Sequence, residues 1–282
     1  MKVEDQASKL RSLMDRARRP RTIAVASGKG GVGKSNVALN LAVLLAAAGN
    51  RVALVDADLS LANLDVLAGV DTRANLSHVI AGAKRLDEVI IDLPSGVQLV
   101  PGASGLAKMA HLSEFQRAQL TSELTALEAD NDVMVVDCGA GIGPDVMHFV
   151  SAADDVVVVT TPEPTAITDG YALVKVLAKR STDAKISLLV NFSPDRQQAR
   201  MTHERISRVA WQFMQVRVLD AGYVLSDPKV REAVRRREPF VLAYPKCPAS
   251  RCLAALATKL STGGTILDRR EGFFRRVVNW LG

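Results

Sequence analysis

One stretch decides the fold of this chain: Ile23-Ala24-Val25-Ala26-Ser27-Gly28-Lys29-Gly30-Gly31-Val32-Gly33-Lys34-Ser35. It joins a short apolar segment to a glycine-rich turn and to the start of a long apolar helix. Gly28, four further residues and Gly33-Lys34-Ser35 fit the pattern G-x-x-x-x-G-K-[ST]. Glycines let successive backbone N–H groups turn toward phosphates, and the following helix adds the positive end of its dipole. We therefore expect a phosphate-binding loop between a buried strand and a helix.

The residue types of this loop predict a nucleotide with a divalent cation. Lys34 would reach the β- and γ-phosphates, and the Ser35 hydroxyl would take a coordination position on Mg²⁺. The expected cofactors are ATP or ADP with Mg²⁺. The residues expected to hold the phosphates are Gly28, Lys29, Gly30, Gly31, Val32, Gly33, Lys34, Ser35 and Asn36.

The composition fits one large α/β domain. The chain has 282 residues, 48% of them hydrophobic and only 4% aromatic, which suits a Val/Ile/Leu sheet covered by Ala/Leu helices. We expect a doubly wound, mostly parallel sheet flanked by helices. No apolar run reaches roughly 18 residues, so no transmembrane helix is expected, and the charged N-terminus differs from a secretion signal. The three cysteines, Cys138, Cys247 and Cys252, lack metal-site spacing and favour a reducing cytoplasm.

The positive charge is concentrated at the two ends of the chain. The net charge is +6. Residues 1–22 contain seven Lys/Arg and three Asp/Glu, and residues 269–282 contain four Arg and one Glu, which leaves about −1 for the residues between them. This distribution favours acidic partners or anionic lipid over a DNA-binding face, and nucleic acid is not an expected partner.

Acidic residues follow two of the predicted buried strands. Asp56 ends the strand that begins at Arg51, with Asp58 two residues later, and Asp137 ends the strand that begins at Val133. In a parallel sheet, ligands bind at the carboxyl ends of the strands, where these carboxylates would lie. We therefore expect them near the phosphate loop.

The loop contains a second lysine that the general pattern does not require. With Lys29, the sequence Gly28–Ser35 resembles the deviant Walker A loop of the MinD/ParA family, in which the extra lysine reaches phosphates held by the partner subunit. The segments Asp56–Asp65, Asp137–Gly141 and Thr161–Gly170 are similar to the two switches and a later helix start of that family. The resemblance implies an ATP hydrolase that forms an ATP-dependent homodimer.

The resemblance also implies roles for single residues at the matching positions. Catalytic roles fall on Lys29, Lys34 and Asp58; the two lysines would stabilise charge on the transferring phosphoryl group, and Asp58 would position water. The implied Mg²⁺ ligands are Ser35, Asp58 and Asp137, the last through water. The implied dimer interface contains Lys29, Asn63 and Asp169, and the implied adenine site contains Asn191, Asp227 and Pro228. Capping of a turn is the alternative for Asn191. Cys138 stands where these relatives often have Thr, so no side-chain role is assigned there.

Residues 1–21 form a predicted basic, helical extension. Asp5-Gln6-Ala7-Ser8-Lys9-Leu10-Arg11 resembles the D-Q-A-x-x-L-R motif of the FlhG/FleN group within the same family. In that group the extension stimulates the SRP-type GTPase FlhF. The implied partner-binding residues are Asp5, Gln6, Ala7, Leu10 and Arg11. The alternative is a frayed, solvated helix.

Residues 263–282 are predicted to be a flexible break followed by an amphipathic helix. One face carries Phe273, Phe274, Val277, Val278 and Leu281, with Trp280 at its edge and arginines elsewhere. This composition is typical of a helix that lies on an anionic membrane surface. The alternative is a helix docked on the protein's own core. Both states could alternate, with the helix docked in the monomer and released in the dimer.

Together these features predict an ATPase domain over residues 22–262 and a FlhG/FleN-type role in flagellar number and placement. The implied localisation is cytoplasmic, and peripheral on the inner face of the membrane when ATP is bound. Flagellar switch-complex proteins or a flagellar transcription regulator are further implied partners. The alternatives are a MinD-type division-site ATPase, against which the 21 residues before Thr22 argue, and a ParA-type DNA-partitioning ATPase.

Overall fold

The fold was analysed in a computed structural model of the chain. It describes residues 20–58, 62–102, 114–180, 185–262 and 272–281. The N-terminal motif between Asp5 and Arg11 therefore lies outside the described residues, as do the predicted break at 263–271 and part of the first switch at 59–61.

The described strands form one eight-stranded sheet in the order β3-β4-β2-β5-β1-β6-β7-β8. All neighbouring strands are parallel except β3 and β4. The predicted doubly wound, mostly parallel α/β sheet is confirmed. The strands are β1 (Arg21–Ser27), β2 (Val52–Ala57), β3 (Ile91–Asp92), β4 (Val97–Val100), β5 (Val133–Ala140), β6 (Asp155–Thr160), β7 (Lys185–Ser193) and β8 (Leu219–Leu225).

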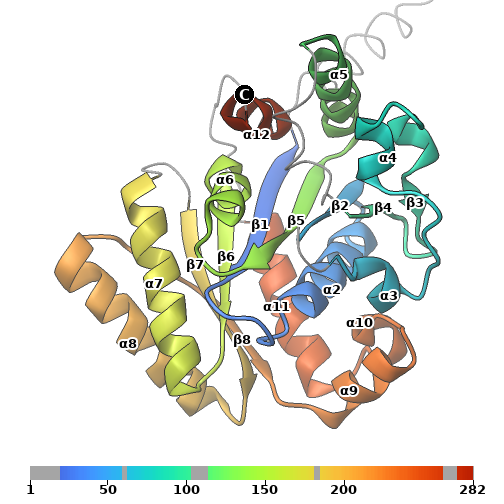
Figure 1. Cartoon of the computed structure of the whole chain (residues 1–282). Helices are drawn as coiled ribbons and strands as arrows, with labels where there is room; N and C mark the ends of the chain where they lie inside the picture. The colour runs from blue at the N-terminus through green and yellow to red at the C-terminus, as the bar shows by residue number, and fades with distance from the viewer. Residues whose placement is uncertain (1–19, 59–61, 103–113, 181–184, 263–271, 282) are drawn as a thin grey trace, which may run out of the picture.

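Helices cover both faces of this sheet (Figure 1). They are α2 (Lys34–Ala47), α3 (Leu64–Ala68), α4 (Leu76–Ile80), α5 (Glu114–Asp130), α6 (Pro144–Ala152), α7 (Pro164–Arg180), α8 (Arg196–Met214), α9 (Pro228–Arg235), α10 (Phe240–Ala243), α11 (Pro248–Thr262) and α12 (Phe273–Leu281). The core on one face includes residues of α2, α3, α9, α10 and α11. The core on the other includes residues of α4 to α8 and α12.

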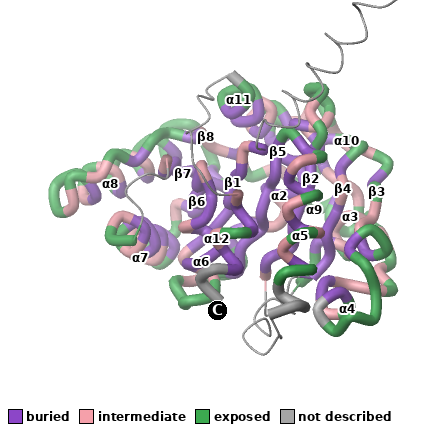
Figure 2. The backbone as a smooth tube through the Cα atoms, turned by 90° about the horizontal axis from the view of Figure 1, so that it is seen from above, coloured by how far each residue is buried: buried purple, intermediate pink, exposed green. Residues whose placement is uncertain are grey.

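Burial on both faces explains the sequences of the central strands. β1, β2 and β6 are almost continuously apolar and buried, as is usual for parallel strands covered by two layers of helices. Figure 2 shows the buried backbone concentrated along these strands. β1 lies between β5 and β6, so the turn after Ser27 opens at the centre of the sheet's carboxyl edge.

Two elements differ from the prediction. Helix α6 was not expected, because the glycines between Gly139 and Gly143 indicate a loop rather than the start of a helix. Gly143 is the extended N-cap of α6, and Pro144 is its first residue. The apolar pattern of the sequence predicts a last strand from Val216 to Val224, whereas β8 begins at Leu219. Gln215 ends α8 in a left-handed conformation, and pairing with β7 starts only at Leu219.

Candidate functional site

The glycine-rich loop is packed too closely for side chains at two positions. A Cβ at Gly28 would lie 2.0 Å from the carbonyl oxygen of Asp169, and Gly33 has a left-handed φ of 84° at the N-cap of α2. Gly31 is also left-handed, with a φ of 80°. These constraints require glycine and hold the loop between β1, α2 and the start of α7.

Lys34 contacts Asp137 from the carboxyl end of β5, and its Nζ lies 3.3 Å from Ser35 Oγ. The Lys34 side chain is buried, and Asp137 is fully buried. Asp58 is close enough to Asp137 for its charge to raise the pKa of that carboxyl, and its Oδ1 lies 3.6 Å from the position that a Cβ on Gly139 would take. The three predicted Mg²⁺ ligands are therefore brought together.

The donor set fits Mg²⁺ with a nucleotide. Oδ2 of Asp137 is buried and has no hydrogen-bond partner among the residues that the structure describes. Two carboxylates and a hydroxyl are hard oxygen ligands of the kind Mg²⁺ prefers, with water and phosphate oxygens completing the shell. Burial raises the pKa of Asp137 and the Asp58 charge adds to this, while contact with Lys34 and Ser35 opposes it.

Asp56 organises the first switch rather than reaching the loop. Its Oδ2 accepts hydrogen bonds from the backbone N–H groups of Asn63 and Leu64, at 3.0 and 3.1 Å, and its Oδ1 accepts one from Asp58 at 3.2 Å. Burial, with the charge of Asp137, raises the pKa of Asp56 to about 6, and these N–H groups partly offset the effect. Its position agrees with a structural role.

The second lysine of the loop, Lys29, contacts residues at the start of α7. Lys29 Nζ lies 2.9 Å from Thr165 Oγ1 and 3.5 Å from the Glu163 carboxylate, and 40% of the lysine side chain is exposed. The run Thr161–Gly170 stood out in the sequence, but Glu163 and Thr165 had been given no role. Lys29 thus contacts residues of its own subunit at the surface, whereas Lys34 is buried against Asp137.

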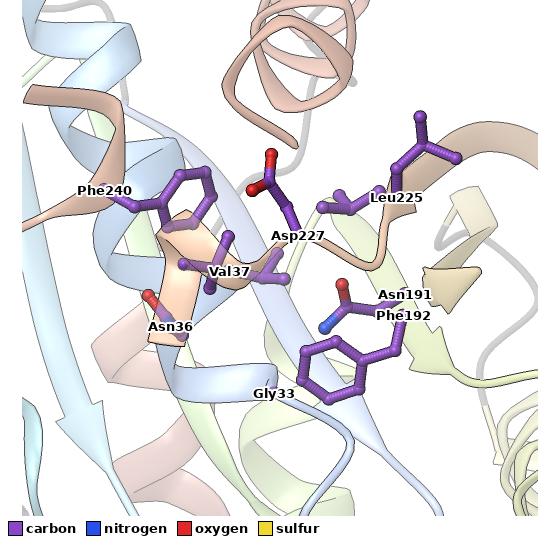
Figure 3. A pocket seen from close by; sticks show the side chains of 10 residues that line it. Gly33, Asn36, Val37, Asn191, Phe192, Leu225, Asp227 and Phe240 are labelled. Carbon is purple, nitrogen blue, oxygen red and sulfur yellow. The ribbon is translucent and has the colours of Figure 1, made fainter. Parts of the chain in front are cut away.

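A small cavity of about 20 Å³ opens beside the loop (Figure 3). Asn191 lies at its wall and donates from Nδ2 to the Val32 carbonyl at 2.8 Å, so its side chain bonds to the phosphate loop rather than to a local turn. Asp227 caps α9 by accepting from Lys229 N–H at 2.9 Å, and Pro228 is the first residue of that helix. The cavity is lined by Gly33, Asn36, Val37, Asn191, Phe192, Val224, Leu225, Asp227, Val230 and Phe240.

The two other residues implied for a dimer interface lie at the surface of the same region. Asn63 is exposed at the N-cap of α3, and Asp169 is half-buried on α7 with its backbone against Gly28. Their interface role stays a prediction. Cys138 is fully buried on β5, and burial raises the pKa of its thiol, so it is a packing residue here.

Helix α12 is docked in the core on the face of α5 and α6 (Figure 1). Its predicted apolar face is turned inward: the exposed fractions of Phe273, Phe274, Val277 and Val278 lie between 1% and 5%. The docked alternative therefore describes this structure. Trp280 and Leu281 belong to α12, but their side chains lie outside the described set. No helix in the described ranges is long and apolar enough to cross a membrane.

Two polar contacts, which sequence reasoning had missed, fix the docked helix. Oε1 of the buried Glu128 accepts the Phe274 N–H at 2.5 Å, and a Cβ at Gly272 would lie 2.2 Å from Glu128 Oε2. Arg276 lies 3.7 Å from Asp154, just before β6. A carboxylate at the start of a helix interacts favourably with the helix dipole. α12 is thus held by specific polar contacts as well as by apolar burial.

Comparison with known proteins gives consistent matches. A family profile described as AAA domain matches residues 20–189. The chain is 41% identical over 259 residues to the antiactivator FleN of Pseudomonas aeruginosa, covering 91% of this chain and 92% of FleN. It is 34% identical over 296 residues to the flagellum site-determining protein YlxH of Helicobacter pylori, covering 99% and 100%. The septum site-determining protein MinD of Pyrococcus horikoshii, solved with Mg-ADP, superposes with a TM-score of 0.69 at 25% identity, over 88% of this chain and 100% of that one.

Proposed function

The chain belongs to the FlhG/FleN group of the MinD/ParA family of P-loop ATPases, and from this premise we propose that it is an ATP-driven switch controlling flagellar number and placement. It is a Mg²⁺-dependent ATP hydrolase. The observation that carries the proposal is the separation of its two loop lysines, one buried against Asp137 and one at the surface against Thr165. The names of the two flagellar relatives, an antiactivator and a site-determining protein, support the flagellar role.

We propose that the residues around the buried Lys34 and Asp137 bind and hydrolyse the nucleotide. Lys34 would stabilise charge on the transferring phosphoryl group, and Asp58 would orient the attacking water. Ser35, Asp58 and Asp137 would hold Mg²⁺, which neutralises phosphate charge when bound. Lys34 and Asp137 form a direct ion pair. When Mg²⁺ and the nucleotide bind, Asp137 would interact with the metal and Lys34 with the phosphates.

The exposed lysine is proposed to act across a homodimer. Its contacts with Thr165 and Glu163 are solvent-accessible, and exposed ion pairs contribute little stability. Lys29 could therefore exchange them for the phosphates of a second subunit at small cost. Asn63 and Asp169 would contribute to the same interface.

Release of α12 is proposed to follow ATP-driven dimerisation. A Cβ at Gly139 would lie 3.2 Å from Val146 Cγ2 on α6, and α6 packs against α12. Gly139 also lies beside Asp58. A rearrangement around the γ-phosphate would therefore be transmitted to α12 through the packing of Gly139 against α6. The released face would bind anionic lipid, and a dimer presenting two such helices would bind more tightly than a monomer.

The partner interactions are proposed from those of the FlhG/FleN group. The extension around Asp5–Arg11 would stimulate FlhF, and flagellar switch proteins or a transcription regulator would be further partners. The division-site alternative predicts no effect on FlhF. The DNA-partitioning alternative predicts salt-sensitive DNA binding.

The experiment that tests the switch is the variant Lys29→Ala. We expect it to bind Mg-ATP but to remain monomeric in light scattering, and to lose ATP-stimulated co-sedimentation with anionic liposomes. Lys84→Ala, at an exposed lysine that pairs with Glu88, is the matched control. A Lys29→Ala protein that dimerises normally with ATP would overturn the role in the partner's site.

A further inference from the structure

Two consecutive residues of β7 contact the same glycine of the phosphate loop. A Cβ at Gly33 would lie 2.4 Å from Asn191 Nδ2 and 3.0 Å from Cζ of Phe192. Consecutive side chains of a regular strand point to opposite faces of the sheet. The strand must therefore be interrupted at this point.

The interruption is a β-bulge at the end of β7. Val190 is paired with Tyr223 and Ser193 with Leu225, so two residues of β7 stand opposite the single Val224 of β8. Phe192 is the residue that absorbs the change, with a left-handed φ of 54°. Bulges next to functional sites commonly redirect a side chain, and here the bulge turns the phenyl ring toward the loop (Figure 3).

Burial of the ring does not explain this arrangement. A left-handed conformation is strained for a bulky residue, and such strain persists where a function requires it. A phenyl ring could offset the strain by packing in the core, but Phe192 is 42% exposed. The ring is instead accessible to a group that binds from outside.

We propose that Phe192 is a specificity-determining residue that stacks on the purine base of the bound nucleotide. This inference rests on the proposed nucleotide site. The cavity of about 20 Å³ has room for about one water molecule, so the site must widen when a base enters. Asn191 offers its amide to the edge of the base, while Phe192 offers an aromatic face. A fused purine presents a larger face than a pyrimidine.

The test compares a ligand that has a base with one that lacks it. Dissociation constants for ATP and for inorganic tripolyphosphate, each with Mg²⁺, are measured by calorimetry on the full chain and on Phe192→Ala. Stacking of one base on an aromatic side chain predicts a loss of about tenfold in ATP affinity. Tripolyphosphate affinity should stay within about twofold, as should both affinities in the control Phe213→Ala, which removes an exposed ring from α8.

A second variant separates stacking from backbone strain. Asn tolerates the left-handed conformation, so Phe192→Asn should unfold at a higher temperature than the parent and still lose about tenfold in ATP affinity. Equal losses for ATP and tripolyphosphate, or unchanged ATP affinity in both variants, would overturn the stacking role alone. Failure of the parent chain to bind ATP would instead overturn the nucleotide site itself.

Discussion

The phosphate loop and helix α12 lie at opposite ends of the parallel sheet, and they differ in what fixes their structure. The loop follows from its own sequence pattern, because glycine is required at Gly28, where a Cβ would clash with Asp169, and at Gly33, where φ is left-handed. α12 is determined by distant contacts with Glu128, Asp154 and the core of α5 and α6. We expect a backbone that requires glycine to stay constant through the cycle, whereas a helix docked through side-chain contacts can be released. We therefore expect the phosphate loop to bind the nucleotide and α12 to be the part that moves.

The largest expected effect is at the loop. Lys34→Ala should lower the rate of ATP hydrolysis by about 10³-fold, because it removes a preorganised positive charge from the phosphates. It also leaves the buried Asp137 without its cation. Steady-state phosphate release measures the effect. Lys29→Ala is the comparison for nucleotide binding, measured by calorimetry, which this variant should keep. Similar losses of binding in both variants would contradict the division of roles between the two lysines.

At α12, the apolar contacts should give the next largest effect. Phe274→Ala removes a ring that is 1% exposed and should weaken docking by about 3 kcal/mol. Hydrogen exchange of the Val277 and Val278 amides in the ADP state should then accelerate by about 100-fold. The neighbouring exposed Arg275 gives the control Arg275→Ala, for which the same amides should be unaffected. Equal protection in both variants would show that the helix is not held by its apolar face.

The fold and the loop could be predicted largely from the sequence. Strand β5 begins with four consecutive apolar residues, Val133 to Val136, and the spacing of Gly28, Gly33 and Lys34 specifies its own local geometry. The docked state of α12 could not be decided, because an amphipathic face fits a membrane and a protein core equally well. The choice depends on Glu128, which is 146 residues away from Phe274. Phe192 was missed because its direction follows from the pairing register of β7 and β8, which no local pattern encodes.

The smallest expected effect comes from the polar contact that caps α12. Glu128→Gln keeps the shape of the side chain but removes its charge, and should weaken docking by about 1 kcal/mol. The variant leaves the apolar face of α12 intact. Liposome binding in the ADP state should therefore increase about fivefold while ATP hydrolysis stays unchanged. Glu123→Gln, elsewhere on α5, is the control. A decrease in liposome binding would mean that Glu128 supports the released state instead.

The coupling between the phosphate loop and α12 is tested most directly by hydrogen exchange of residues 273–278 with Mg-ADP, with a non-hydrolysable ATP analogue, and with the same analogue in Lys29→Ala. We predict strong protection with ADP, loss of protection with the analogue in the parent chain, and retained protection in the variant. If α12 stays protected in an ATP-bound dimer that nevertheless binds anionic liposomes, the coupling between the phosphate loop and the helix is contradicted.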